Sequence, residues 1–105
     1  MPAPGAYTVV FAPIAARQID AALLWWSRNR PAAPDLLRRE LEAVLRLIED
    51  APQAGRRTKS RLFRDVRRLL LRSSGHHLYY QIVAAPREIR VVYFRHARRR
   101  PVWER

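Results

Sequence analysis

The feature of this sequence that most restricts its fold is a change in the spacing of the apolar residues along the chain. Residues 6–11 (AYTVVF) are β-branched and aromatic, and they predict a strand. From Ile14 onward the apolar residues recur at helical spacing, which predicts one helix that ends before Pro31 and a second that begins near Pro34 and ends at Ala51-Pro52. The apolar stripes consist of Ile14, Ile19, Ala22, Leu23 and Trp26, and of Leu37, Leu41, Val44, Leu45 and Ile48. The short, Pro-containing link predicts an antiparallel helical hairpin.

The second half of the chain is typical of strands. Three strand-like segments cover residues 64–72, 77–84 and 88–95. The breaks between them, Ser73-Ser74-Gly75 and Ala85-Pro86-Arg87, are rich in turn formers, and such short connections favour an antiparallel meander. We therefore predict an α+β fold in the order β-α-α-β-β-β. Its N-terminal strand and helical hairpin pack on one face of a mainly antiparallel sheet, and the other face stays partly open.

The length of 105 residues predicts a single domain, 1–105, with an ordered core at about 6–97 and a basic tail at 98–105. No apolar run approaches the roughly 20 residues that span a membrane, and the N-terminal residues do not resemble a signal peptide. The chain has no cysteine, which fits a reducing compartment. We expect a cytoplasmic protein.

The net charge of +12 is confined to one half of the sequence. Residues 1–52 carry six Arg and six Asp or Glu, whereas residues 53–105 carry fifteen Lys or Arg against three acids. Such an asymmetry indicates a polyanionic partner, either nucleic acid or an acidic protein. Arg forms bidentate contacts with carboxylates and with phosphates, so it suits both.

Five segments of the chain, taken in order, resemble the RelE/ParE family of toxins. YTVVFAPIAARQI is similar to the family's opening strand and first helix, and LLRRELEAVLRLIEDAPQAG to its second helix. DVRRLLL, LYYQIV and IRVVYFRHARRRP are similar to its last three strands. The resemblance extends over about 90 residues of the chain.

This resemblance implies the toxin of a two-gene, type II toxin–antitoxin module from a bacterium. The implied partner is a cognate antitoxin that covers the toxin with an acidic or amphipathic C-terminal segment, in a hetero-oligomer. Operator DNA would be bound only through the antitoxin. RelE-type members cut mRNA on the ribosome, whereas ParE-type members inhibit DNA gyrase and are not nucleases. Neither type implies a cofactor, a metal or a membrane.

The residues that could support RNA cleavage are few. Such a reaction needs a base, a cation at the phosphate and an acid for the leaving oxygen. The candidates are Lys59, Arg61, Arg67 and His96, with Arg99 as a further phosphate ligand. Trp103 stands where a tyrosine would be useful, and an indole cannot donate the proton. The adjacent His76 and His77 would point to opposite faces of a strand, which makes a poor metal site.

The tail HARRRP looks more like that of ParE-type members, although many relatives have an acidic residue near the position of Arg100. We therefore expect a gyrase inhibitor that acts by occlusion and is not an enzyme. A RelE-like, ribosome-dependent mRNA endoribonuclease is the alternative. A non-enzymatic, basic nucleic-acid-binding module is a further alternative. The residues expected to bind the antitoxin or the target are Arg67, Arg95, His96, Arg98, Arg99, Arg100 and Trp103.

Overall fold

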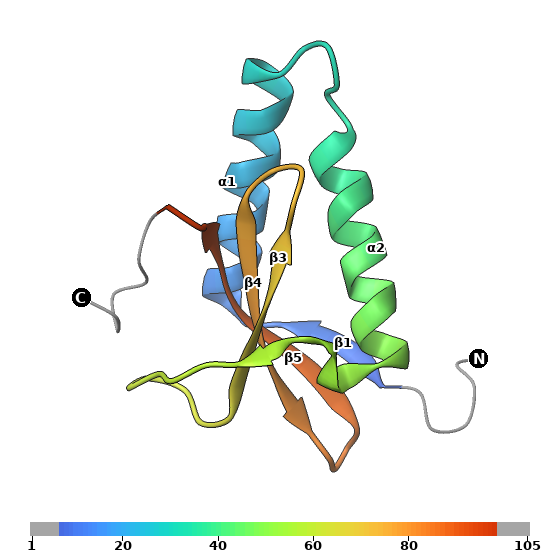
Figure 1. Ribbon diagram of the computed structural model, residues 1–105, viewed down its shortest axis with the longest axis vertical. Helices are drawn as coiled ribbons and strands as arrows, with labels where there is room; N and C mark the ends of the chain where they lie inside the picture. Colours follow the sequence, from blue (N-terminus) through green and yellow to red (C-terminus); the bar gives the residue numbers. More distant parts are fainter. Residues whose placement is uncertain (1–6, 99–105) are drawn as a thin grey trace.

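The computed structural model describes residues 7–98, which form a sheet with a helical hairpin over one face (Figure 1). The elements are β1 (Thr8–Phe11), α1 (Pro13–Asn29), α2 (Leu36–Asp50), a 3₁₀ turn (Pro52–Ala54), β2 (Arg56–Arg57), β3 (Val66–Leu71), β4 (His76–Val83) and β5 (Glu88–His96). None of the helices within residues 7–98 has the length and apolar character that a membrane span requires.

The sheet has five strands in the order β1-β5-β4-β3-β2. β1 runs parallel to β5, and the remaining pairs are antiparallel, so the predicted α+β class and order of the main elements are confirmed. The 3₁₀ turn and β2 were not predicted. β2 is only two arginines long, and it exists because Arg56 and Arg57 pair with Arg68 and Arg67 of β3.

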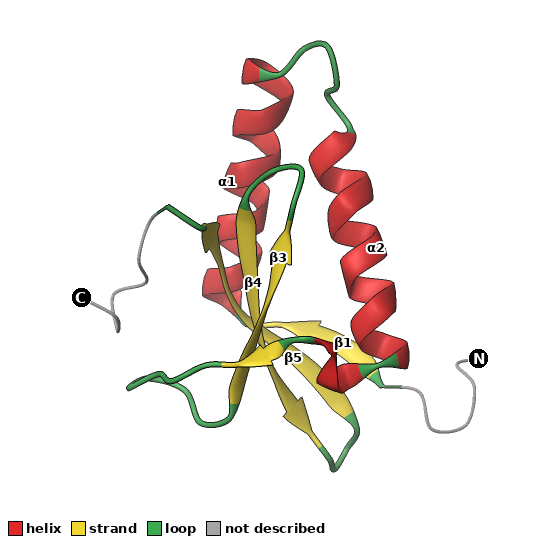
Figure 2. Ribbon diagram, viewed as in Figure 1, coloured by secondary structure: helices red, strands yellow, loops and turns green. Residues whose placement is uncertain are grey.

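The two helices of the hairpin lie side by side (Figure 2). Their apolar stripes share a core cluster with residues of the sheet, except Ile14, which was expected on the apolar face of the first helix but is 42% exposed. Pro13 stands in the first turn of α1, as expected from its fixed φ. Trp26 is buried and its Nε1 donates a hydrogen bond of 2.8 Å to the carbonyl of Ala33, which ties the end of α1 to the link before α2. Its neighbour Trp25, which is not part of the apolar stripe, is 50% exposed.

The link that leaves α2 is fixed to the sheet by Tyr80. The Tyr80 hydroxyl donates to the carbonyl of Pro52 at 2.6 Å and accepts from the amide of Gly55 at 2.7 Å. A Cβ atom at Gly55 would lie 2.6 Å from the same hydroxyl, so only glycine permits this approach. This contact places β2 at the edge of the sheet.

A bulge in β5 allows the second face of the sheet to build a small core of its own. Tyr79 pairs with Tyr93 but Tyr80 pairs with Val91, so Val92 is the extra residue on β5. A second cluster of Val66, Tyr79, Val92 and Tyr93 results, with Phe63 packed against it. Tyr79 faces away from the helices, yet it is buried, because the segment that carries Phe63 covers this part of the face.

Candidate functional site on the open face of the sheet

The face of the sheet opposite the helices presents its side chains in rows that run across the strands. Residues paired on neighbouring antiparallel strands point to the same side. One row consists of Arg56, Arg68, Tyr79 and Tyr93, and the next of Leu70, His77 and Arg95. These seven residues are called the open face below. They include three arginines and a histidine but no acidic residue.

Aromatic rings form the floor of the open face, and one of them contacts the guanidinium of Arg95. The rings of Tyr79 and Tyr93 meet edge to face at 6.1 Å, and the ring of His77 lies edge-on to Tyr79 at 6.0 Å. The guanidinium of Arg95 lies 5.3 Å from the centroid of the Tyr93 ring. Such a cation–π contact orients a guanidinium while leaving its N–H groups available to an anion. The arrangement suits phosphates or carboxylates.

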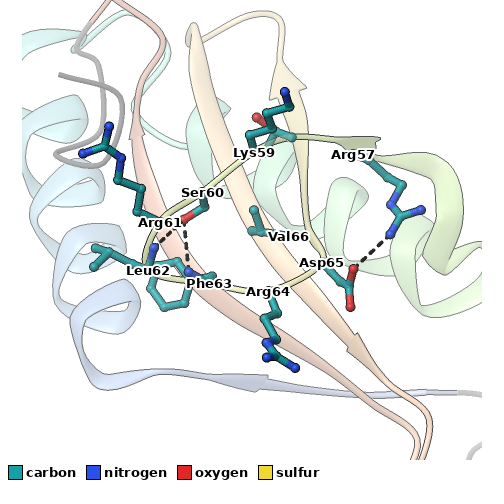
Figure 3. Close-up of a pocket in the computed structure, with 10 residues that line it drawn as sticks. Arg57, Lys59, Ser60, Arg61, Leu62, Phe63, Arg64, Asp65 and Val66 are labelled. Carbon is teal, nitrogen blue, oxygen red and sulfur yellow. Dashed lines mark hydrogen bonds and ion pairs between the residues drawn. The ribbon is translucent and has the colours of Figure 1, made fainter.

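The loop between β2 and β3 surrounds an open hollow beside this face (Figure 3). The Ser60 hydroxyl accepts hydrogen bonds of 3.1 Å from the amides of Leu62 and Phe63, which shapes the turn of the loop. Arg57 and Asp65 form an ion pair of 2.9 Å between exposed side chains. Lys59 and Arg61 are both exposed in this loop, and Figure 3 shows them pointing in different directions. The two cations therefore do not converge on one phosphate position.

Arg67 does not share a face with Arg95, although both were expected in one binding surface. Its Nη1 donates hydrogen bonds to the carbonyls of Gly55 at 2.9 Å and Gln53 at 3.3 Å. Strand alternation places Arg67 beside its partner Tyr80 on the helix-covered side. In the structure Arg67 thus stabilises the link from α2 to β2 rather than presenting its charge on the open face.

His96 also lies on the helix-covered side. Its ring contacts the ring of His76 edge-on at 5.3 Å, and its Nδ1 accepts a hydrogen bond of 3.2 Å from the amide of Arg98. The predicted set Lys59, Arg61, Arg67 and His96 is thus divided between an exposed loop and the helix-covered side. Arg99, Arg100 and Trp103 lie outside the described residues.

Two buried groups next to these residues have shifted pKa values. Burial, reinforced by the nearby His96, lowers the pKa of His76 from 6.5 to about 4. Burial raises the pKa of the Tyr80 hydroxyl, against the opposing effects of the Gly55 hydrogen bond and Arg67. Both groups are therefore neutral at physiological pH. Within residues 7–98 there is no cluster of three His, Cys, Asp or Glu residues that could hold a metal ion.

Of the seven residues of the open face, only Arg95 was predicted from the sequence to bind a partner. The charged or titratable residues that the prediction missed are Arg56, Arg68 and His77. The position of Arg68 on the open face follows from strand alternation. Leu69 and Leu71 face the helices, so Arg68 faces the other side. His77 follows in the same way from the core position of Leu78. Arg56 gave no such signal, because its strand is too short to show a period.

The geometry defines an α+β protein in which a helical hairpin covers one face of a five-stranded sheet. The other, open face of the sheet is basic and aromatic. Residues 9–101 match the family model described as the ParE toxin of the type II toxin–antitoxin system parDE. The match covers most of the chain, so the chain belongs to this family of toxins, and the resemblance read from the sequence is confirmed.

Two solved structures from E. coli are similar to this chain. The isolated RelE toxin aligns with a TM-score of 0.62 and 23% identity, covering 94% of this chain and 93% of that one. A chain of the intact RelBE toxin–antitoxin complex aligns with a TM-score of 0.61 and 25% identity, covering 90% of this chain and 100% of that one. No curated protein matches the chain by sequence. Membership in a toxin–antitoxin family implies an antitoxin as partner.

Proposed function

We propose that this toxin inhibits DNA gyrase by occlusion, that it acts through the open face, and that its cognate antitoxin neutralises it by covering the same surface. The observation that carries the proposal is the separation of the candidate nuclease residues. Arg67 is hydrogen-bonded to two backbone carbonyls, and His96 contacts His76 on the helix-covered side. A general acid–base reaction needs its groups within hydrogen-bond reach of one substrate. Binding needs only a complementary surface, which the open face provides.

The basic character of the open face supports the proposal that the antitoxin covers this face. Its arginines have no acidic residue among them in the two rows, so an acidic segment laid over them would pair with Arg56, Arg68 and Arg95. An uncompensated buried charge is costly, which requires carboxylates on the partner at these positions. We further propose that the protein acts in the bacterial cytoplasm, where such a complex would form.

A second candidate function is ribosome-dependent cleavage of mRNA. It is favoured by His77, an imidazole on the open face that is paired with Arg95 across the strands and packed edge-on against Tyr79. Histidine is suited to proton transfer near neutral pH, and Arg95 could hold a phosphate. In this function His77 would take the role that the sequence analysis gave to His96 or Lys59.

The experiment that separates the two is a pair of assays on the purified toxin. Relaxed plasmid is supercoiled by gyrase while the toxin is titrated in and the antitoxin is then added back. We expect loss of supercoiling that the antitoxin restores. Normal supercoiling together with cleavage of mRNA in a translating extract, abolished by His77→Gln, would replace gyrase inhibition with the second candidate.

A further inference from the structure

The strand β1 stands at one end of the strand order, so one of its edges pairs with β5 and the other pairs with no strand of residues 7–98. The amides of Thr8 and Ala12 donate hydrogen bonds of 3.0 Å and 2.9 Å to carbonyls on the β5 side. Alternate residues of a strand turn their N–H and C=O groups to opposite edges, so those of Val9 and Phe11 point away from the sheet. This free edge of β1 offers donors and acceptors to another strand.

The free edge lacks the features that commonly keep sheet edges from pairing, which are prolines, lysines and bulges. The strand Thr8–Phe11 has the sequence TVVF and pairs with β5 in an unbroken register. Phe11 lies on the same side of the strand as Val9, which packs against the helix-covered core, yet Phe11 is 42% exposed. Ile14, in the first turn of α1, is 42% exposed as well. An apolar border therefore accompanies the free edge.

The distribution of charge indicates which partner suits this edge. Residues 1–16 contain no Asp, Glu, Lys or Arg, and no other stretch of the chain without them is as long. On the neighbouring strand, Arg90 forms an ion pair of 3.2 Å with Glu88. Two copies of a chain with a net charge of +12 repel each other wherever their arginines meet, and least where neither copy carries a charge. An acidic partner gains its attraction at the arginines instead.

We propose that two copies of this chain associate through β1, strand against strand and antiparallel, about a two-fold axis at Val10. In this register Val9 and Phe11 of one copy lie opposite Phe11 and Val9 of the other. Each of these pairs exchanges both of its N–H···O=C bonds. The Phe11 ring of each copy then covers Val9 of the other, on the side of the helices. The contact is self-complementary, as a closed two-fold dimer requires.

The dimer places the two open faces together. Paired residues on adjacent strands point to the same side, so both helical hairpins lie on one side of the joined sheet and both open faces on the other. A target would meet two basic surfaces of the same protein. Binding of the second surface is then intramolecular, which strengthens binding without any new kind of contact. The dimer itself forms in the same way whether gyrase or mRNA is the target.

The test is sedimentation equilibrium of the purified full-length toxin, without antitoxin, over a range of protein concentrations. Val10→Lys and Val10→Glu each place two like charges opposite each other at the axis, where the Cα atoms would be about 4.5 Å apart. Leu62→Lys and Leu62→Glu are matched controls, because Leu62 is 60% exposed and lies in the loop between β2 and β3, at the other end of the strand order. Circular dichroism confirms that each variant is folded.

We expect a wild-type dimer whose dissociation constant rises by roughly tenfold or more in each Val10 variant and by less than about threefold in each Leu62 control. An equimolar mixture of Val10→Lys and Val10→Glu should dimerise again, because opposite charges then meet at the axis. A substitution that only perturbs the fold of the single chain would not be rescued by mixing. If a Val10 variant does not fold, Phe11→Lys, at an exposed position of the same strand, replaces it and should also weaken the dimer.

A wild type that stays monomeric at every concentration overturns the dimer but leaves the proposed inhibition of gyrase intact. A dimer that the substitutions in β1 leave unchanged, or that the Leu62 controls weaken equally, lies on another surface and also overturns the proposal. Failure of the mixed Val10 variants to dimerise contradicts the two-fold axis at Val10.

Discussion

The two faces of the sheet are built from the same strands but serve different ends. On the helix-covered face, Leu78, Ile89 and Val91 are fully buried beneath α1 and α2. On the open face, Arg68, His77 and Arg95 occupy the alternate positions, above a small aromatic cluster. Because successive side chains of a strand point to opposite faces, one segment can contribute to stability and to binding without a conflict. We therefore expect substitutions on the helix-covered face to lower stability and substitutions on the open face to weaken binding.

The largest difference in the loss of unfolding free energy is expected between substitutions of two leucines on adjacent strands. Leu78 is fully buried against the helices, and Leu70 is 44% exposed on the open face. Leu78→Ala should lower the free energy of unfolding by about 2–5 kcal/mol, because it leaves a cavity in the core. Leu70→Ala should lower it by less than about 1 kcal/mol. Urea denaturation followed by circular dichroism measures both, and equal losses would contradict the assignment of the two faces.

The next effect is expected at the hydroxyl that anchors the link after α2. Tyr80→Phe removes the partner of both the Gly55 amide and the Pro52 carbonyl. Leaving such buried groups unpaired should cost about 1–3 kcal/mol of unfolding free energy. Thermal unfolding of Tyr80→Phe beside the wild type checks this value.

Charge reversal is expected to affect stability at Arg67 of β3 and binding at Arg95 of β5. Arg67→Glu breaks the hydrogen bonds to Gly55 and Gln53 and should lower stability by about 1 kcal/mol or more. Arg95→Glu should leave the melting temperature nearly unchanged and weaken antitoxin binding by roughly tenfold. Calorimetric titration and thermal unfolding of both variants measure the two effects. If Arg67→Glu weakens binding but not stability, the assignment of Arg67 to the helix-covered side is wrong.

A further effect is expected from pH. The pKa of His76 is lowered from 6.5 to about 4 in the folded chain, so between these values the unfolded chain binds the proton and the folded chain does not. Stability from the neutral imidazole is therefore fully present above pH 6.5 and is lost as pH falls toward 4. Glu40 and His96 are the charged groups that act on this ring.

His76→Phe keeps a ring to stack on Phe94 but cannot be protonated. Its melting temperature should rise relative to that of the wild type as the pH is lowered through this range. Parallel melting curves at several pH values measure the difference. A constant difference between the two proteins would show that His76 is protonated as easily when folded as when unfolded.

The main elements of the fold could be predicted because each has a clear period. The stripes of α1 and α2 and the runs in β3, β4 and β5 place Trp26, Leu37 and Leu78 in the core as expected. β2 and the 3₁₀ turn could not be predicted, because they depend on contacts from Tyr80 and Arg67 rather than on local pattern. Long-range hydrogen bonds leave no signature in the sequence.

The positive charge of the site could be predicted from the sequence, but the residues that form its surface could not. The excess of arginine in the second half indicated a polyanionic partner, and Arg95 lies on the open face. The charge distribution could not predict that Arg67 and His96 lie on the helix-covered side of the sheet. Alternation from Ile89 and Val91 alone would put Tyr93 and Arg95 on the helix-covered side. The bulge at Val92 reverses this, so that Phe94 and His96 lie on the helix-covered side and Tyr93 and Arg95 lie on the open face. A count of alternate residues fails at such a position.

The central claim, that the toxin acts on gyrase through the open face, is tested most directly by the toxin concentration that halves supercoiling. The double variant Arg68→Glu/Arg95→Glu is compared with Arg38→Glu/Arg46→Glu, which makes the same change of charge on the exposed surface of α2. We predict that the open-face variant needs roughly tenfold more toxin or more, and that the helix variant stays within about twofold of the wild type. Equal losses in the two variants, or no inhibition by the wild type, would contradict the account.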